Sequence, residues 1–254
     1  MRKQLLRTYS IAGIAAALFA AASPAVGVTV QWTDWISGSP SLGTATGQIT
    51  TTTTTVGVTY SNPQGYAFIQ TGVGTDYFQN GSGATGSPYT SSVVDNIPTA
   101  AEMIGLTYAG SQTLSFSETI ANPFFSYVSL NGNGYAFDQD FDILSFGHST
   151  SPEGPNYSGY WGAGTSAKNV VDLGGGNFEY QLIGTGEPHG TIRFKGAFDT
   201  VSWRSLSSEN WNGFTVGIQG TAREVFSVPD AGSSLPLLGL VFAGLAWGNR
   251  RRSI

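Results

Sequence analysis

Short runs of hydrophobic residues alternate with polar punctuation through residues 28–227, and no long stretch repeats with helical periodicity. The runs are rich in β-branched and aromatic residues, and Gly, Asn, Pro and Ser separate them, which is typical of an all-β sandwich. We therefore expect an all-β, jelly-roll-like sandwich. Its predicted strands are residues 28–35, 47–60, 112–116, 124–130, 135–146, 178–183, 190–195, 197–203 and 213–219.

Three further segments have distinct predictions. Residues 131–134 read Asn-Gly-Asn-Gly, a strong turn signal between two strands. Residues 96–105, with Pro98 near the start, predict one short helical turn. Residues 147–176 are rich in Gly, Ser, Pro and Asn, so we expect a long surface loop there.

Both ends of the chain differ from its middle. Arg2, Lys3 and Arg7 precede an apolar run at residues 11–22, which predicts an N-terminal signal peptide over residues 1–27. Residues 231–249 carry no charge, and a helix of that length spans about 28 Å, close to the thickness of a bilayer's hydrocarbon core. This predicts a C-terminal transmembrane helix.

The arginines Arg250, Arg251 and Arg252 follow that span directly and predict a cytoplasmic stop, with the middle of the chain facing outward. The expected organisation is a signal peptide at 1–27, a β-sandwich ectodomain at 28–227 and a sorting segment at 228–254.

The C-terminal segment resembles a PEP-CTERM-type sorting signal. The resemblance rests on Val228, Pro229, Asp230, Ala231 and Gly232, followed by the apolar span and the arginine cluster. It is similar to the variant that reads Val-Pro-Asp-Ser-Gly, with Ala231 in the place of the serine. The resemblance implies an exported substrate of an exosortase. Such a protein is anchored in the membrane by its C-terminal helix before processing and then lies at the cell surface or in the extracellular matrix.

The charge distribution excludes nucleic acid as a partner. Residues 28–228 hold five basic and 15 acidic residues, a formal net charge of −10. A phosphate-binding surface needs clustered Lys and Arg, which this stretch lacks. The chain also has no cysteine, so disulfides, cysteine nucleophiles and thiolate zinc sites are excluded.

Aromatic residues in polar stretches are candidates for glycan binding. Trp161, beside Tyr160, and Trp211 lie in predicted loops, whereas Trp32, Trp35 and Trp203 lie in predicted strands and are expected in the core. A flat aromatic face outside the core can stack on a sugar ring, and nearby amides can bind the hydroxyls. Packing in the core is the alternative role for Trp161 and Trp211.

Three carboxylates, Asp138, Asp140 and Asp142, share one face if residues 135–146 form one strand. Oxygen-only clusters suit Ca²⁺, so these residues form a candidate calcium site. A solvated strand face is the alternative. Their spacing resembles the start of a calcium loop, but the glycine expected after the third acid is absent.

The remaining candidates for chemistry are Glu187 and His189, which are two positions apart and suit either acid–base chemistry or metal binding. The alternative is an ordinary hairpin turn. We find no convincing nucleophile motif. The sequence predicts a non-catalytic component or binder of extracellular polysaccharide. The alternatives are a polysaccharide-active enzyme with paired carboxylates, including Glu187, and a purely structural matrix protein without a ligand.

Overall fold

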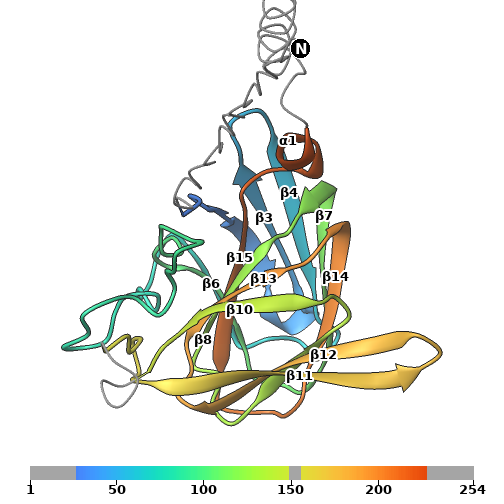
Figure 1. Cartoon of the computed structure of the whole chain (residues 1–254). Coiled ribbons are helices and arrows are strands. Elements are labelled where there is room, and N and C mark those ends of the chain that lie inside the picture. The colour runs from blue at the N-terminus through green and yellow to red at the C-terminus, as the bar shows by residue number, and fades with distance from the viewer. Residues whose placement is uncertain (1–26, 149–155, 228–254) are drawn as a thin grey trace, which may run out of the picture.

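Two antiparallel sheets packed against each other make up the part of the chain that the computed structural model describes, residues 27–148 and 156–227 (Figure 1). The two-sheet, almost all-β arrangement agrees with the predicted β-sandwich. Residues 1–26 of the predicted signal peptide and the whole sorting segment at 228–254 lie outside the described residues. Within the described ranges, no helix has the length and apolar character needed to cross a membrane.

One sheet has eight strands in the order β11-β12-β9-β14-β7-β4-β3-β2. Its strands, in chain order, are β2 (Asp34–Ser39), β3 (Thr44–Thr50), β4 (Thr55–Ser61), β7 (Gly110–Ala121), β9 (Gly134–Phe137), β11 (Gly164–Gly174), β12 (Asn177–Gly186) and β14 (Ala197–Ser205). A short 3₁₀ helix, η1 (Pro40–Leu42), connects β2 to β3.

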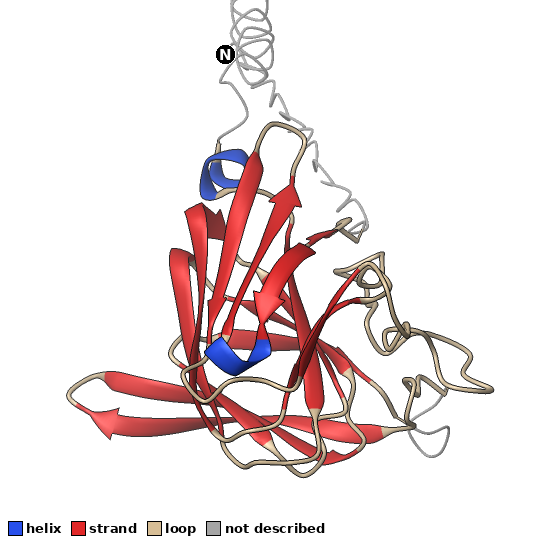
Figure 2. Cartoon of the chain, turned by 180° about the vertical axis from the view of Figure 1, so that it is seen from behind, coloured by secondary structure: helices blue, strands red, loops and turns tan. Residues whose placement is uncertain are grey.

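The second sheet has seven strands in the order β10-β13-β8-β15-β6-β5, and β1 also pairs with β15. Its strands are β1 (Gln31–Trp32), β5 (Phe68–Thr71), β6 (Glu102–Leu106), β8 (Phe124–Val128), β10 (Phe141–Phe146), β13 (Gly190–Phe194) and β15 (Asn212–Ile218). A long irregular segment between β5 and β6, seen as loop in Figure 2, covers one side of this sheet.

The strands form where alternate side chains can enter the core. In β3 and β4, positions alternate between buried and more exposed, so Ala45, Ile49, Val56 and Val58 point inward. This is the period of two that a pleated strand imposes. The central strand β15 is buried at every position, because its neighbouring strands flank it and the eight-stranded sheet covers its inner face.

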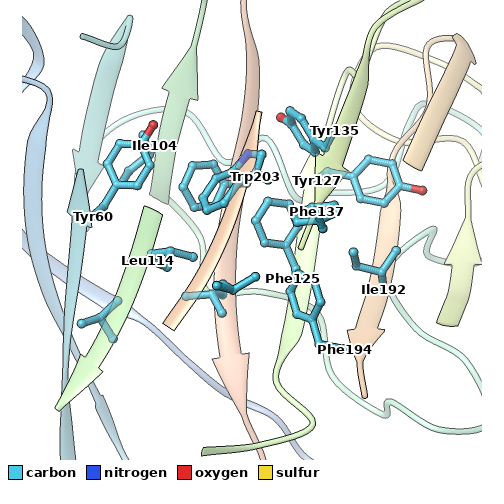
Figure 3. Close-up of a cluster of buried hydrophobic side chains, with 14 of the residues drawn as sticks. Tyr60, Ile104, Leu114, Phe125, Tyr127, Tyr135, Phe137, Ile192, Phe194 and Trp203 are labelled. Atoms are coloured by element: carbon cyan, nitrogen blue, oxygen red, sulfur yellow. The ribbon is translucent and has the colours of Figure 1, made fainter. Parts of the chain in front are cut away.

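Large aromatic rings from both sheets fill the space between the layers (Figure 3). Phe125 of β8 stacks on Phe214 of β15 with centroids 4.9 Å apart, and both rings meet Trp203 of the opposite sheet edge-on at 5.6 and 5.3 Å. Trp32, Trp35 and Trp203 are all buried, as predicted. The interlocked rings give the sandwich a rigid body on which loops can be held.

The threonine run breaks the strand predicted over residues 47–60. Residues 51–54 form a tight turn between β3 and β4, and these two strands pair from Thr44–Ser61 to Thr50–Thr55. The Thr51 hydroxyl oxygen accepts hydrogen bonds from the backbone N–H groups of Thr53 (3.3 Å) and Thr54 (3.1 Å). The prediction of one strand was wrong because a threonine side chain can stabilise a turn as well as a strand.

The strand predicted over residues 135–146 is also two strands, and they belong to different sheets. β9 pairs with β12 and β14, whereas β10 pairs with β13. At the break, Asp138 exchanges hydrogen bonds with Ser202, accepting the backbone N–H of Ser202 on its carboxylate (3.0 Å) and donating its own N–H to the Ser202 carbonyl (3.0 Å). The turn at residues 131–134 likewise carries the chain from β8 in one sheet to β9 in the other.

Three further parts of the secondary-structure prediction were wrong. The strand predicted over residues 28–35 is divided between β1 and β2, which belong to different sheets. Residues 164–174 of the predicted long loop form β11, which pairs only with β12 and extends the eight-stranded sheet at its edge. The β11–β12 hairpin projects from the body of the sandwich (Figure 1). No helix forms over residues 96–105: residues 96–101 are irregular, and residues 102–105 belong to β6, which is fully buried.

The described part of the chain ends in one turn of helix, α1 (Ala222–Phe226). Thr221 and Glu224 cap it reciprocally: the Glu224 carboxylate accepts the Thr221 N–H (2.6 Å), and Thr221 Oγ1 accepts the Glu224 N–H (3.2 Å). The same carboxylate accepts hydrogen bonds from the hydroxyls of Thr51 and Thr53 in the β3–β4 turn. These contacts hold the end of the domain against the sandwich.

Candidate functional site

The structure brings Trp161 and Trp211 together at one end of the sandwich. They line a cavity of about 230 Å³, here called the Trp pocket, whose walls are formed by Ser129, Asn131, Trp161, Glu187, Asn210 and Trp211. Each residue lies in a connection next to a strand: after β8, before β11, between β12 and β13, or before β15. Loops on a rigid β-scaffold are where binding residues concentrate.

Both tryptophans belong to a larger aromatic cluster. Tyr77 lies at its centre, with ring centroids 4.9 Å from Trp211, 5.1 Å from Tyr160 and 6.2 Å from Trp161. Tyr160 meets Trp161 edge-on at 4.7 Å, and Phe68 of β5 meets Trp211 at 5.2 Å. Tyr77 and Trp161 are stacked and the other pairs meet edge-to-face, and this mutual packing fixes the ring orientations without any ligand.

The two tryptophans have different environments. Trp161 is 50% exposed, so a large part of its ring is open to solvent. Trp211 is only partly exposed and packs against a small buried cluster that includes Phe78, Met103 and Val128. The sequence left glycan stacking and core packing open for both residues. In the structure, Trp211 packs against the core and also lines the pocket, whereas Trp161 leaves half of its surface exposed.

A tight loop holds Tyr160 and Trp161. The backbone N–H of Gly159 donates to the carbonyl of Gly162 (2.8 Å), and the N–H of Gly162 donates back to the carbonyl of Gly159 (3.0 Å). A Cβ atom at position 159 would lie 2.4 Å from the ring of His189. The loop thus sits directly on the buried histidine, and only glycine permits so close an approach.

Hydrogen-bonding groups form the polar wall of the Trp pocket. The Ser129 hydroxyl donates to a Glu187 carboxylate oxygen (2.7 Å), and the Asn131 side-chain amide donates to the Ser129 oxygen (3.0 Å). Ser129 has a positive φ of 56°, a conformation that costs a non-glycine residue free energy and that often occurs at functional sites. In the described residues, Ser129 is the only hydrogen-bond donor to the Glu187 carboxylate, so the carboxylate can accept further hydrogen bonds from the pocket.

A second carboxylate lies behind this wall. Glu209 accepts side-chain hydrogen bonds from Asn133 (3.0 Å) and Asn212. Burial, together with the negative charge of Glu187, raises the pKa of Glu209 above its ordinary value. Glu209 does not line the Trp pocket, and its hydrogen bonds give it a role in fixing the strand connections around it.

His189 does not join Glu187 in an acid–base pair. Its ring is fully buried, and Nδ1 lies 3.1 Å from the hydroxyl of Tyr89. Burial lowers the pKa of His189 to about 4, so the ring is neutral at pH 7. Its place below Gly159 makes it a support for the aromatic loop.

The carboxylates of the candidate calcium site are paired with basic side chains. Asp140 forms ion pairs with Lys168 and Lys195, and Asp142 with Lys195 and Arg193. Despite partial burial, which acts in the opposite direction, the hydrogen bonds and charges of Lys168 and Lys195 hold the pKa of Asp140 below its usual value.

The Asp138 carboxylate instead accepts a hydrogen bond from the backbone N–H of Ser202 in β14. The described residues contain no group of three His, Asp or Glu side chains that could hold a metal ion together. The break between β9 and β10 removes the shared strand face on which the calcium site depended, and the described contacts give these acids other partners.

Several pocket residues were not singled out from the sequence. Ser129 and Asn131 of the pocket walls, and Tyr77 of the aromatic cluster, come from segments far from Trp161 in the chain, and only the tertiary fold brings them together. Asn210, in contrast, was expected to lie near the ligand because it is next to Trp211 in the sequence. The Asn-Gly-Asn-Gly turn at 131–134 was the one available signal, because it marks the end of β8 where Ser129 and Asn131 enter the pocket.

Comparison with known proteins adds one finding. No curated protein and no solved structure matches the chain. The predicted sorting residues Val228–Gly232 and Arg250–Arg252 lie outside the described residues, but they fall within the stretch that matches a family model. Residues 227–252 carry the VPDSG-CTERM motif, a PEP-CTERM-like sorting signal, which indicates an exported, surface-associated protein.

Proposed function

We propose that this protein is processed at its C-terminal motif by an exosortase and then acts outside the cell as a non-catalytic binder of extracellular polysaccharide. The observation that carries the binding role is the Trp pocket. A half-exposed Trp161 ring stands beside the amides of Asn131 and Asn210 and the Glu187 carboxylate. An apolar ring face next to hydrogen-bonding groups is the chemistry that a sugar ring requires.

The binding role is tested by retention of the protein on the host's own extracellular polysaccharide. The full-length chain, purified in mild detergent, should be retained saturably. Trp161→Ala should reduce the affinity by roughly tenfold or more, because stacking and hot-spot aromatics contribute about 1–3 kcal/mol.

Phe226→Ala is the matched control. Phe226 is 54% exposed, similar to Trp161, but it lies on α1. Strand β15 begins next to Trp211 and ends four residues before α1, so the control residue sits at the opposite end of the domain (Figure 1). Equal loss of retention in both variants, or retention that Trp161→Ala leaves unchanged, would refute binding at the Trp pocket. Absence of any retention would favour a purely structural matrix protein.

A polysaccharide-active enzyme is the second candidate, and the proximity of Glu187 and Glu209 is the observation in its favour. Two carboxylates with different environments are the usual apparatus of glycoside hydrolysis. Against it, Asn133 and Asn212 engage Glu209 behind the pocket wall. Incubation with the host polysaccharide separates the two functions: shortening of the chains that Glu187→Gln abolishes supports the enzyme, and an unchanged size distribution supports the binder.

The sorting role has an independent test. If an exosortase processes the motif, intact-mass analysis of surface-extracted protein from the native host should find a chain that ends near Val228–Asp230 and lacks Arg250–Arg252. Replacement of Pro229 and Asp230 by alanine should leave the arginine tail in place. A tail that persists on the wild-type surface protein would show that the C-terminal segment is a permanent anchor.

A further inference from the structure

The Trp pocket is acidic, and the described residues in its walls include no positively charged side chain. Glu187 is its one charged residue among the described lining residues. Ser129 donates one hydrogen bond to this carboxylate, and a single neutral donor leaves its negative charge unbalanced. The second carboxylate, Glu209, lies close enough for Glu187 to raise its pKa.

The basic side chains of the described domain all lie away from the Trp pocket, and four of the five form ion pairs there. Lys168, Lys195 and Arg193 pair with Asp140 and Asp142, and Arg204 binds Glu179 through two hydrogen bonds of 2.9 and 3.1 Å. The fifth, Arg223, lies on α1 at the opposite end of the sandwich. Residues 28–228 together carry a net charge of −10. An anionic sugar would therefore enter the pocket against the local charge and against the field of the whole domain.

The remaining walls suit a cation. Trp161 and Trp211 stand at 71° to each other with centroids 6.4 Å apart, and Trp161 is half exposed. Tryptophan is the best of the aromatic residues for attracting a cation to its ring face. A carboxylate beside a tryptophan face offers an ammonium group both an ion pair and a cation–π contact.

We propose that the Trp pocket is specific for amino sugars with a free, protonated amine, so that the polysaccharide ligand is a partly or fully de-N-acetylated hexosamine polymer. The sugar ring lies against Trp161, and its ammonium group pairs with Glu187. Asn131 and Asn210 contact the neighbouring hydroxyls. This inference rests on the proposed polysaccharide-binding function and narrows it to one class of sugar.

Four soluble oligosaccharides of equal length test the preference: β-1,4-linked hexamers of glucosamine, N-acetylglucosamine and glucose, and an α-1,4-linked hexamer of galacturonic acid. Binding to the full-length chain in detergent is measured by calorimetry at pH 6, where a sugar amine carries its proton. The glucosamine hexamer should bind about tenfold tighter than the two neutral hexamers, and the acidic hexamer should bind most weakly.

Glu187→Gln is the informative variant. Glutamine keeps the oxygen that accepts the Ser129 hydrogen bond but removes the charge, so the glucosamine preference should fall to about unity while the neutral hexamers keep their affinity. Glu179→Gln is the matched control. Glu179 is also a partly buried, hydrogen-bonded glutamate, but it binds Arg204 on the eight-stranded sheet, and its loss should leave the preference intact.

The possible outcomes distinguish the amino-sugar inference from the polysaccharide-binding function on which it rests. If the N-acetylglucosamine or glucose hexamer binds as tightly as the glucosamine hexamer, the amino-sugar inference is wrong and the binding function stands. The same conclusion holds if only the host polysaccharide binds and Trp161→Ala abolishes that binding. If glucosamine binding survives in both Trp161→Ala and Glu187→Gln, the domain attracts polycations through its net charge alone and the inference is also wrong. If no oligosaccharide and no host polysaccharide binds, both proposals fail.

Discussion

The ring centroids of Trp161 and Trp211 lie 6.4 Å apart, although 50 positions separate the two residues in the chain. Trp161 reaches this position on the loop before β11, at the edge of the eight-stranded sheet, and Trp211 directly precedes β15 in the centre of the other sheet. The pair therefore joins the two layers at one end of the sandwich. The geometry of the pocket depends on how these two connections are held.

We expect the two tryptophans to differ in their contribution to stability. Trp211→Ala should lower the free energy of unfolding by about 3 kcal/mol, because the ring packs against Phe78, Met103 and Val128. Trp161→Ala should cost less than about 1 kcal/mol, because half of its ring is already in water. Urea unfolding followed by far-UV circular dichroism measures both values. Equal losses would mean that Trp161 is part of the core and is not a binding surface.

A second prediction concerns the glycine below the aromatic loop. Gly159→Ala would place a Cβ atom 2.4 Å from the His189 ring, so the loop or the ring must shift. Because Tyr160 and Trp161 follow directly, retention on polysaccharide should fall about tenfold even though residue 159 contacts no ligand.

Gly57→Ala serves as the control for that substitution. A Cβ atom at position 57 would meet Ser117 at 3.5 Å, an ordinary contact, and the position lies on β4. This variant should keep both cooperative unfolding and full retention. Unimpaired retention in Gly159→Ala would show that the position of the aromatic loop does not matter for binding.

The sequence predicted most of the core and little of the site. Alternation of apolar residues placed Trp35, Trp203 and most strands correctly, because burial of one strand face imposes a period of two on the sequence. The pocket could not be predicted in the same way. Ser129 meets Glu187 across 58 positions, and this pairing depends on β13 lying beside β8, which no local pattern encodes.

The errors in strand boundaries have local physical causes. Threonine favours a strand, but the Thr51 hydroxyl also accepts backbone N–H groups and closes a turn. β11 has no fully buried position, since it lies at the edge of the sheet, and its composition therefore looks like a loop. Propensity and alternation report burial, so they fail where a strand is exposed or where a side chain stabilises the backbone.

A third prediction addresses Asp138, Asp140 and Asp142. Because Lys168, Lys195 and Arg193 already pair with two of these carboxylates, millimolar calcium should not raise the melting temperature. Asp140→Asn should lower the melting temperature by a few degrees at most, since the ion pairs are partly exposed and such pairs contribute little. Differential scanning fluorimetry with calcium and with a chelator checks both points. A calcium-dependent rise that Asp140→Asn removes would restore the calcium site.

The remaining prediction uses two buried groups with opposite dependence on pH. Burial lowers the pKa of His189 from 6.5 to about 4, so the unfolded chain binds a proton more readily and stability falls as the pH drops from 6.5 towards 4. Glu102 has the opposite behaviour. Burial, with a smaller contribution from Asp34, raises its pKa from 4.5 to about 7, although its carboxylate accepts the Trp35 N–H at 2.7 Å.

Glu102 therefore contributes full stability below pH 4.5 and loses it as the pH rises to about 7, a total of about 3 kcal/mol. In the wild type, between pH 4.5 and 6.5, His189 makes the free energy of unfolding rise with pH and Glu102 makes it fall. These two contributions oppose each other, so stability should change little in that range. Glu102→Gln keeps an oxygen for the Trp35 N–H but cannot ionise. Its free energy of unfolding at pH 7 should therefore approach or exceed that of the wild type. Between pH 4.5 and 6.5 its stability should rise more steeply with pH than that of the wild type, because the opposing contribution of Glu102 is gone. Urea unfolding across that range measures both slopes. Identical pH profiles for the wild type and Glu102→Gln would show that the pKa of Glu102 is unchanged by folding. The buried carboxylate would then need a polar partner in addition to the Trp35 amide.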